Sequence, residues 1–91
     1  MRERLHVFIS GLVQGVGFRY ATYRKAGRIG LSGWVRNTPD GRVEAVFEGE
    51  KPVLEEILDW CAQGPALSRV DRVESTWAAA EGGSEEFEIA F

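Results

Sequence analysis

Hydrophobic side chains occupy every second position at the start of the chain. Leu5, Val7 and Ile9 alternate with residues of mixed character, and this period of two is typical of a β-strand with one buried face. The pattern predicts a first strand over residues 5–10. The stretch from Gly11 to Gly17 contains three glycines and predicts a loop.

Apolar and small residues at helical spacing follow that loop. Two glycines near the end of the predicted helix weaken it, and the second of them, Gly30, suits a C-terminal cap. The positions that share one face of this helix are Phe18, Ala21, Thr22, Ala26 and Ile29.

A hairpin pattern comes next. A second strand contains Trp34 and Val35 and ends near Asn37, and a third strand covers residues 43–48. Between them, Thr38-Pro39-Asp40-Gly41 is a strong turn signal. The two strands are therefore expected to pair.

A second helix is expected after the hairpin. Pro52 suits its first position, because proline lacks the N–H that would have no partner there, and Gly64-Pro65 stops it. The apolar stripe of this helix consists of Val53, Leu54, Ile57, Leu58 and Cys61. Glu55, Glu56 and Asp59 fall on its polar side.

The rest of the chain predicts two more strands. One contains Val70 and residues 73–78, a turn follows at residues 81–84, and a short strand runs from Phe87 to Phe91. The order β-α-β-β-α-β with an extra C-terminal strand predicts an α+β, ferredoxin-like two-layer sandwich: an antiparallel sheet with two helices on one face. That fold serves enzymes, RNA binders and regulatory modules alike, so function must be inferred from a site.

Charge is distributed unevenly along the 91 residues. Residues 1–42 carry eight basic and two acidic side chains, a net +6, while residues 43–91 carry three and twelve, a net −9, which gives −3 overall. A basic half can indicate an anionic ligand or nucleic acid, but folding can also mix the two halves into an ordinary solvated surface.

Composition excludes several kinds of site. Cys61 is the only cysteine and His6 the only histidine, which excludes an internal disulfide and any site that needs two histidines. His6 lies off the apolar face of the first strand, and Trp34, Trp60 and Trp77 are expected to be packing residues. No apolar run approaches the roughly 18 residues of a membrane span, and no signal-peptide core is present. We expect a cytoplasmic protein.

The loop before the first helix is the best candidate site. Its backbone N–H groups, with those that lack partners at the helix start, can form a cradle for an anion. Gly15 and Gly17 let the backbone curl towards a ligand. The loop matches neither the Walker A motif nor the dinucleotide-binding fingerprint, and it could also be a simple tight connection.

Two side chains add to this candidate. A cation such as Arg19 in the first helical turn opposes the helix dipole, at a cost of about 0.3–1 kcal/mol. This cost is understandable if the cation and the dipole share one bound anion. Alternatively, the side chain could fold away over the surface. Asn37 is a normal turn residue, but its amide could also hold a water molecule by hydrogen bonds.

Around these residues the sequence resembles the acylphosphatase family. Residues 9–19, Ile-Ser-Gly-Leu-Val-Gln-Gly-Val-Gly-Phe-Arg, match the first signature of that family. Gly-Trp-Val-Arg-Asn at residues 33–37, followed by Gly41-Arg42-Val43 and Gly49, matches the second. The likeness extends to Gly64-Pro65 and to Phe87-Glu88-Ile89, and so covers essentially the whole chain.

This resemblance implies a hydrolase that splits the carboxyl–phosphate bond of small-molecule acyl phosphates into a carboxylate and inorganic phosphate. It implies that Arg19 binds the phosphoryl group and Asn37 positions the attacking water. It also implies that no metal or nucleotide takes part. The length predicts one domain over residues 1–91, and its size and net charge are compatible with a monomer. We expect no cofactor, and neither nucleic acid nor a membrane as a partner. The loop groups expected to bind phosphate are the backbone N–H groups of Gln14, Gly15, Val16, Gly17, Phe18 and Arg19.

Two other functions fit parts of the sequence. RNA-recognition domains share the order of strands and helices and display stacked aromatic residues on their central strands. Here the sequence around Phe8, Val43 and Phe47 lacks the Lys/Arg-Gly-Phe signature of those domains. A domain that binds phosphate without turnover would keep the loop, and acylphosphatase-like domains occur inside larger carbamoyl-handling maturation proteins. The presence of both Arg19 and Asn37 favours the enzyme.

Overall fold

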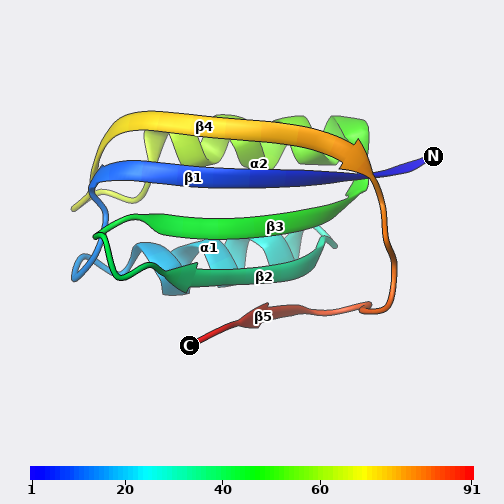
Figure 1. The fold of residues 1–91 in the computed structure, drawn as a ribbon, viewed down its shortest axis with the longest axis horizontal. Helices are drawn as coiled ribbons and strands as arrows, with labels where there is room; N and C mark the ends of the chain where they lie inside the picture. The colour runs from blue at the N-terminus through cyan, green and yellow to red at the C-terminus, as the bar shows by residue number, and fades with distance from the viewer.

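The computed structural model describes residues 1–91, and its elements follow the predicted order, including the extra strand at the C-terminal end (Figure 1). They are β1 (Arg2–Leu12), α1 (Phe18–Arg28), β2 (Ser32–Asn37), β3 (Val43–Glu50), α2 (Lys51–Gln63), β4 (Arg69–Ala79) and β5 (Phe87–Ile89). No helix has the length and apolar character needed to cross a membrane.

The strands form one sheet in the order β4-β1-β3-β2-β5. The pairs β1–β4, β1–β3 and β2–β3 are antiparallel, as predicted. β5, which the sequence alone does not place, runs parallel to β2, with Phe87 opposite Gly33 and Ile89 opposite Val35. The sheet is thus mixed at this edge and antiparallel elsewhere.

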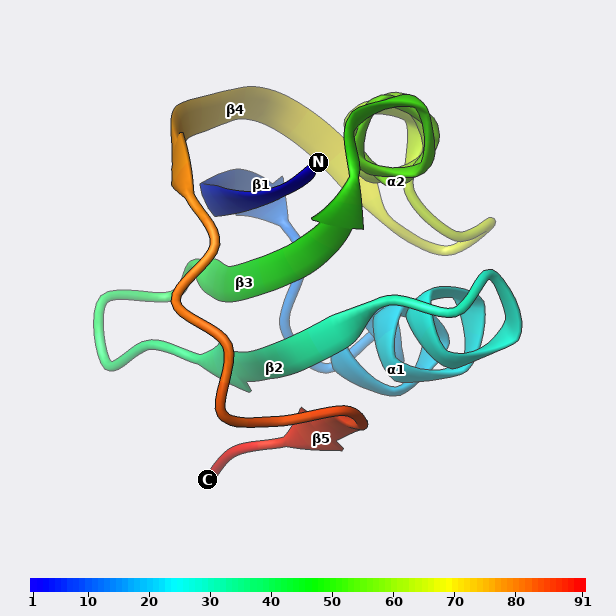
Figure 2. The ribbon, with the colours of Figure 1, turned by 90° about the vertical axis from the view of Figure 1, so that its right-hand side faces the viewer.

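Both helices cover the same face of the sheet, which confirms the two-layer sandwich (Figure 2). Alternate residues of β1 and β3 point towards the helices and are almost completely buried, and each helix adds one stripe to the core. The buried residues that these four elements contribute are Leu5, Val7, Ile9, Val43, Ala45, Phe47, Phe18, Thr22, Ala26, Leu54, Ile57 and Cys61.

The helix ends lie close to their predicted positions. α1 ends at Arg28, and Gly30 follows with a φ of 82°, a left-handed conformation that turns the chain away from the helix. α2 begins at Lys51, so Pro52 is its second residue and not its first. Proline is tolerated there because N–H groups in the first turn have no partner within the helix.

Several residues prove to be packing residues, as expected. Cys61 is completely buried, and this burial raises the pKa of its thiol to about 12, so the thiol stays protonated at neutral pH. Trp60 and Trp77 pack against the core. Phe47 is also buried, in a stack with Phe87, and is therefore not available to stack on a base.

The face of the sheet opposite the helices carries a small polar network. Glu44 accepts a hydrogen bond from the Arg36 Nε at 2.7 Å, and its other oxygen lies 2.7 Å from the His6 Nε2. Burial raises the pKa of Glu44, but the hydrogen bonds to His6 and Arg36 outweigh it and hold the pKa below its usual value. His6 is therefore a structural residue, as predicted.

The segment that follows β4 crosses the sheet to reach β5 (Figure 2), and Glu48 of β3 anchors it. Its carboxylate accepts hydrogen bonds from the backbone N–H groups of Glu81 and Gly82 at 2.8 and 3.0 Å, and from Arg4 at 3.3 Å. Burial raises the pKa of Glu48, but these hydrogen bonds outweigh that effect, so the pKa stays below its usual value.

Replacing Glu48 with alanine is expected to lower the free energy of unfolding at pH 7 by about 1–3 kcal/mol, because two backbone donors lose their acceptor. A carboxyl with a depressed pKa in the folded state stabilises the protein above its unfolded pKa. That contribution is lost as the pH falls through the folded pKa.

The difference in the free energy of unfolding between wild type and Glu48→Ala should therefore shrink as the pH falls below 4.5, the ordinary pKa of this carboxyl. Denaturant unfolding at several pH values measures it. Glu88→Ala, which removes an exposed carboxylate of β5, is the matched control. A difference that stays constant down to acid pH would contradict this role for Glu48.

Candidate active site

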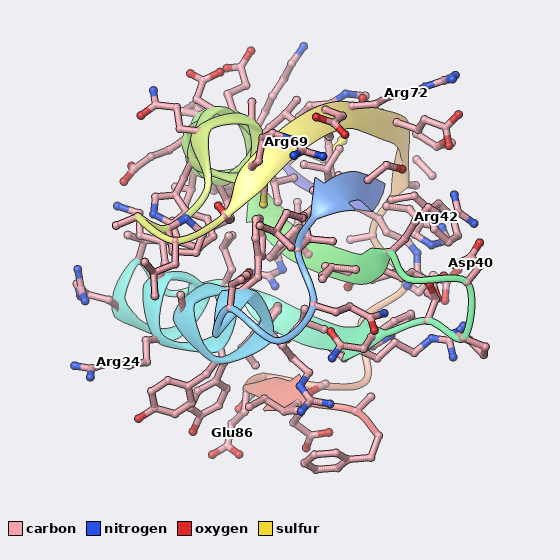
Figure 3. The ribbon with its side chains drawn as sticks, turned by 90° about the vertical axis from the view of Figure 1, so that its left-hand side faces the viewer. Arg24, Asp40, Arg42, Arg69, Arg72 and Glu86 are labelled. Atoms are coloured by element: carbon pink, nitrogen blue, oxygen red, sulfur yellow. The ribbon has the colours of Figure 1, made fainter.

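The loop between β1 and α1 lies at the end of the molecule that faces the viewer in Figure 3. Gly15 and Gly17 have φ values of 76° and 80°, in the left-handed region that L side chains rarely adopt. A Cβ atom at either position would meet no other atom within 4 Å. The loop therefore needs glycine for its backbone conformation and not for lack of space.

The start of α1 is open to an anion. Gly17 is its N-cap, no side chain caps it, and its first turn contains no acidic residue. The first backbone hydrogen bond of the helix joins the Ala21 N–H to the Gly17 carbonyl at 2.9 Å. The N–H groups of residues 18–20 precede this bond, and such groups have no partner within a helix.

Arg19 and Asn37 line the same small hollow, about 160 Å³ in volume. Its wall consists of Val13, Gly15, Gly17, Phe18, Arg19, Tyr20 and Asn37. The Arg19 guanidinium lies 5.1 Å from the centre of the Phe91 ring and forms no salt bridge. Arg19 thus lines the hollow with its guanidinium over the Phe91 ring, and no carboxylate neutralises it.

Asn37 reaches this hollow from the other side. It is the last residue of β2 and pairs with Val43 of β3. Its Oδ1 atom is buried and has no hydrogen-bond partner. An unpaired buried acceptor costs roughly 1–3 kcal/mol, and a water molecule or ligand that donates a hydrogen bond can relieve it.

Two predicted loop residues, Gln14 and Val16, do not line the hollow. Val16 packs against the core. The Gln14 side chain turns to the hairpin, where its Nε2 donates hydrogen bonds to the carbonyl oxygens of Thr38 at 2.7 Å and Arg42 at 2.9 Å. The sequence pattern points only to the backbone N–H of Gln14, and these side-chain contacts depend on the tertiary structure.

The arginines that flank the hairpin turn are held by carboxylates, and Figure 3 labels one such pair, Arg42 and Asp40. Arg42 pairs with Asp40 at 3.0 Å and with Glu74 at 3.5 Å, and it also lies over the Phe8 ring, 4.4 Å from its centre. Arg36 is bound to Glu44. Arg19, by contrast, lines the small hollow without a carboxylate partner.

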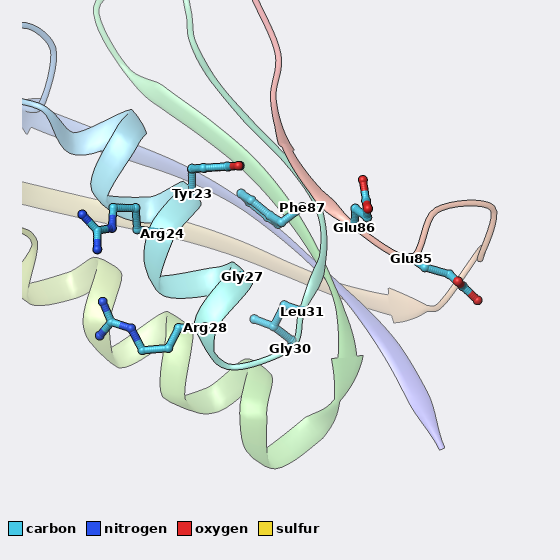
Figure 4. A pocket seen from close by; sticks show the side chains of 9 residues that line it. All are labelled: Tyr23, Arg24, Gly27, Arg28, Gly30, Leu31, Glu85, Glu86 and Phe87. Carbon is cyan, nitrogen blue, oxygen red and sulfur yellow. The ribbon is translucent and has the colours of Figure 1, made fainter.

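A larger hollow of about 570 Å³ lies near the other end of α1 (Figure 4). The guanidinium groups of Arg24 and Arg28 extend away from the carboxylates of Glu85 and Glu86, and no salt bridge crosses the hollow. The loop and the start of α1 lie elsewhere. This hollow lacks the convergent donors that the smaller one offers.

Comparisons with known proteins agree on one family. The family model described as Acylphosphatase matches residues 5–89. The chain is similar to acylphosphatases of Rubrobacter xylanophilus, with 53% identity over 96% of this chain and 79% of that protein, and of Trichormus variabilis, with 54% identity over 87% and 78%. The fold matches a crystal structure of acylphosphatase from Bacillus subtilis with a TM-score of 0.94 and 34% identity, over 98% of this chain and 99% of that one.

Proposed function

Since this chain belongs to the acylphosphatase family and is an enzyme that hydrolyses acyl phosphates, we propose that its active site is the hollow between the β1–α1 loop and the end of β2. Arg19 and the N–H groups of residues 14–19 bind the phosphoryl group. Asn37 orients the attacking water.

The observation that carries this proposal is the unpaired Oδ1 of Asn37. A buried acceptor without a partner lies in the same hollow as an arginine without a salt bridge and a helix start without a cap. A buried acceptor and backbone N–H groups without partners are each unfavourable, and the Arg19 charge adds to the positive end of the helix dipole. A bound phosphoryl group would satisfy the cation and the N–H donors, and a water molecule would satisfy the amide oxygen.

The reaction needs positioning more than covalent chemistry. The water oxygen attacks phosphorus while the bond between phosphorus and the carboxyl oxygen breaks, and the carboxylate leaves with the electron pair. Arg19 and the loop N–H groups stabilise charge on the equatorial phosphoryl oxygens. Asn37 accepts one hydrogen of the water, and the proton lost from this water passes to the phosphate itself.

The leaving group explains why so few residues suffice. A carboxylate has a reference pKa near 4 and can leave without being protonated. The site therefore needs no general acid. We also propose that residues 1–91 act as one domain and as a monomer without metal or cofactor.

Benzoyl phosphate should be a far better substrate than phenyl phosphate. The two leaving groups have reference pKa values about six units apart, near 4 and near 10. We expect kcat/KM in EDTA to differ by at least about 10³-fold. Release of inorganic phosphate measures both rates under the same conditions.

Comparable rates for the two substrates would contradict the proposal, because they would require a general acid that protonates the departing phenolate. A protein that hydrolyses neither substrate, but that inorganic phosphate protects from thermal unfolding, would be a phosphate-binding domain only.

A further inference from the structure

The two halves of the proposed site are not neighbours in the sheet. The phosphate loop follows β1 and Asn37 ends β2, while β3 lies between these two strands. No ladder of backbone hydrogen bonds therefore joins β1 to β2. β3 links them only as far as Val43, which pairs with both Ile9 and Asn37, and the pairing of β1 with β4 ends at Leu12. The position of the phosphate loop relative to the Asn37 amide therefore depends on contacts outside these ladders.

Gln14 spans this gap. Its Nε2 atom uses both of its hydrogens, one for the Thr38 carbonyl and one for the Arg42 carbonyl. Thr38 and Arg42 are joined by their own backbone hydrogen bond of 2.8 Å, and Thr38 directly follows Asn37. No other hydrogen bond joins residues 13–17 to residues 37–42.

We infer that Gln14 is a positioning residue, which holds the Asn37 amide in register with the phosphate loop. This inference rests on the proposed function of Arg19 and Asn37. The side chain of Gln14 acts through the hairpin, and its backbone N–H stays with the loop. Since a misplacement of about 1 Å can lower the rate of an oriented reaction roughly 10²-fold, loss of this link should affect kcat more than substrate binding.

The chemistry of the link favours an amide. One nitrogen must donate to two carbonyl oxygens, which the NH₂ group of glutamine can do and the carboxylate of glutamate cannot. A neutral group also adds no negative charge beside a site for an anion. Methionine has a similar length but no donor, and asparagine keeps the amide on a side chain that is one methylene shorter.

A double-mutant cycle tests the inference. Wild type, Gln14→Met, Asn37→Ala and the double variant are assayed with benzoyl phosphate, and inorganic phosphate serves as competitive inhibitor. We expect Gln14→Met to lower kcat by about 10- to 100-fold. KM and the inhibition constant of phosphate should change less than about threefold, because the groups that bind phosphate are kept.

The decisive result is the behaviour in the Asn37→Ala background. Residues that act as one unit are non-additive, so Gln14→Met should cause less than about a twofold further loss of kcat there. An equal loss of kcat in both backgrounds would overturn the inference, as would an unchanged kcat in Gln14→Met.

Failure of this inference can be told apart from failure of the proposed function. A wild type without activity, or an Asn37→Ala variant with full activity, would refute the proposed site itself. Thermal unfolding with and without phosphate shows whether each variant is folded. Running the same cycle with Gln14→Asn keeps the question answerable if the methionine variant does not fold.

Discussion

Replacing Arg19 with alanine is expected to lower kcat/KM for benzoyl phosphate by at least about 10²-fold, because loss of one preorganised group that stabilises developing charge has effects of this size. Arg19 lies in the first turn of α1, beside N–H groups without partners, and forms no salt bridge that would neutralise it. The lost stabilisation applies to the ground state as well as the transition state. KM should therefore rise while kcat falls.

Two variants make this result specific. Arg19→Lys keeps the charge but loses the planar fork that can grip two phosphoryl oxygens, so it should recover only part of the activity. Arg28→Ala removes an arginine from the last turn of the same helix, which lines the larger hollow and not the small one, and should leave activity nearly unchanged. A loss of similar size in Arg28→Ala would point to the general charge of α1 and not to Arg19.

Replacing Asn37 with alanine should lower kcat by about 10²-fold while inorganic phosphate binds almost as before, since the amide orients water and not the phosphoryl group. Steady-state kinetics with phosphate as a competitive inhibitor measure both quantities. A weakened inhibition by phosphate together with an unchanged kcat would assign Asn37 to phosphate binding.

The same variant should be at least as stable as wild type. The Asn37 Oδ1 is buried without a hydrogen-bond partner, so alanine removes an unsatisfied acceptor and leaves no new one. Functional residues commonly reduce stability in this way. A clear fall in the unfolding temperature of Asn37→Ala would mean that the amide is needed for the fold, and any loss of activity would then need another explanation.

Much of the fold follows from local patterns. The alternation in β1 and the apolar stripes of both helices predict the buried faces correctly, since burial on one side of an element leaves a periodic trace in the sequence. The parallel pairing of β5 leaves no such trace. It depends on the path of the chain across the sheet, which the Glu48 carboxylate fixes by contacts with Glu81 and Gly82.

The site was predictable in part. Arg19 and Asn37 were both singled out, and they line one hollow; their roles stay predictions. The side-chain hydrogen bonds of Gln14 are not predictable from the sequence, because their acceptors are backbone carbonyls 24 and 28 residues away. Every residue has a backbone carbonyl group, so the sequence does not mark which ones accept a hydrogen bond. Only the tertiary structure shows that the Gln14 amide reaches these two.

The position of bond cleavage tests the central claim most directly. Benzoyl phosphate is hydrolysed by the wild-type protein with EDTA in water enriched in ¹⁸O, and the label in both products is measured by mass spectrometry. If water attacks a phosphoryl group held by the loop, the label enters inorganic phosphate and benzoate stays unlabelled. Label in benzoate would mean attack at the carbonyl carbon, and the roles proposed for Arg19 and Asn37 would be wrong.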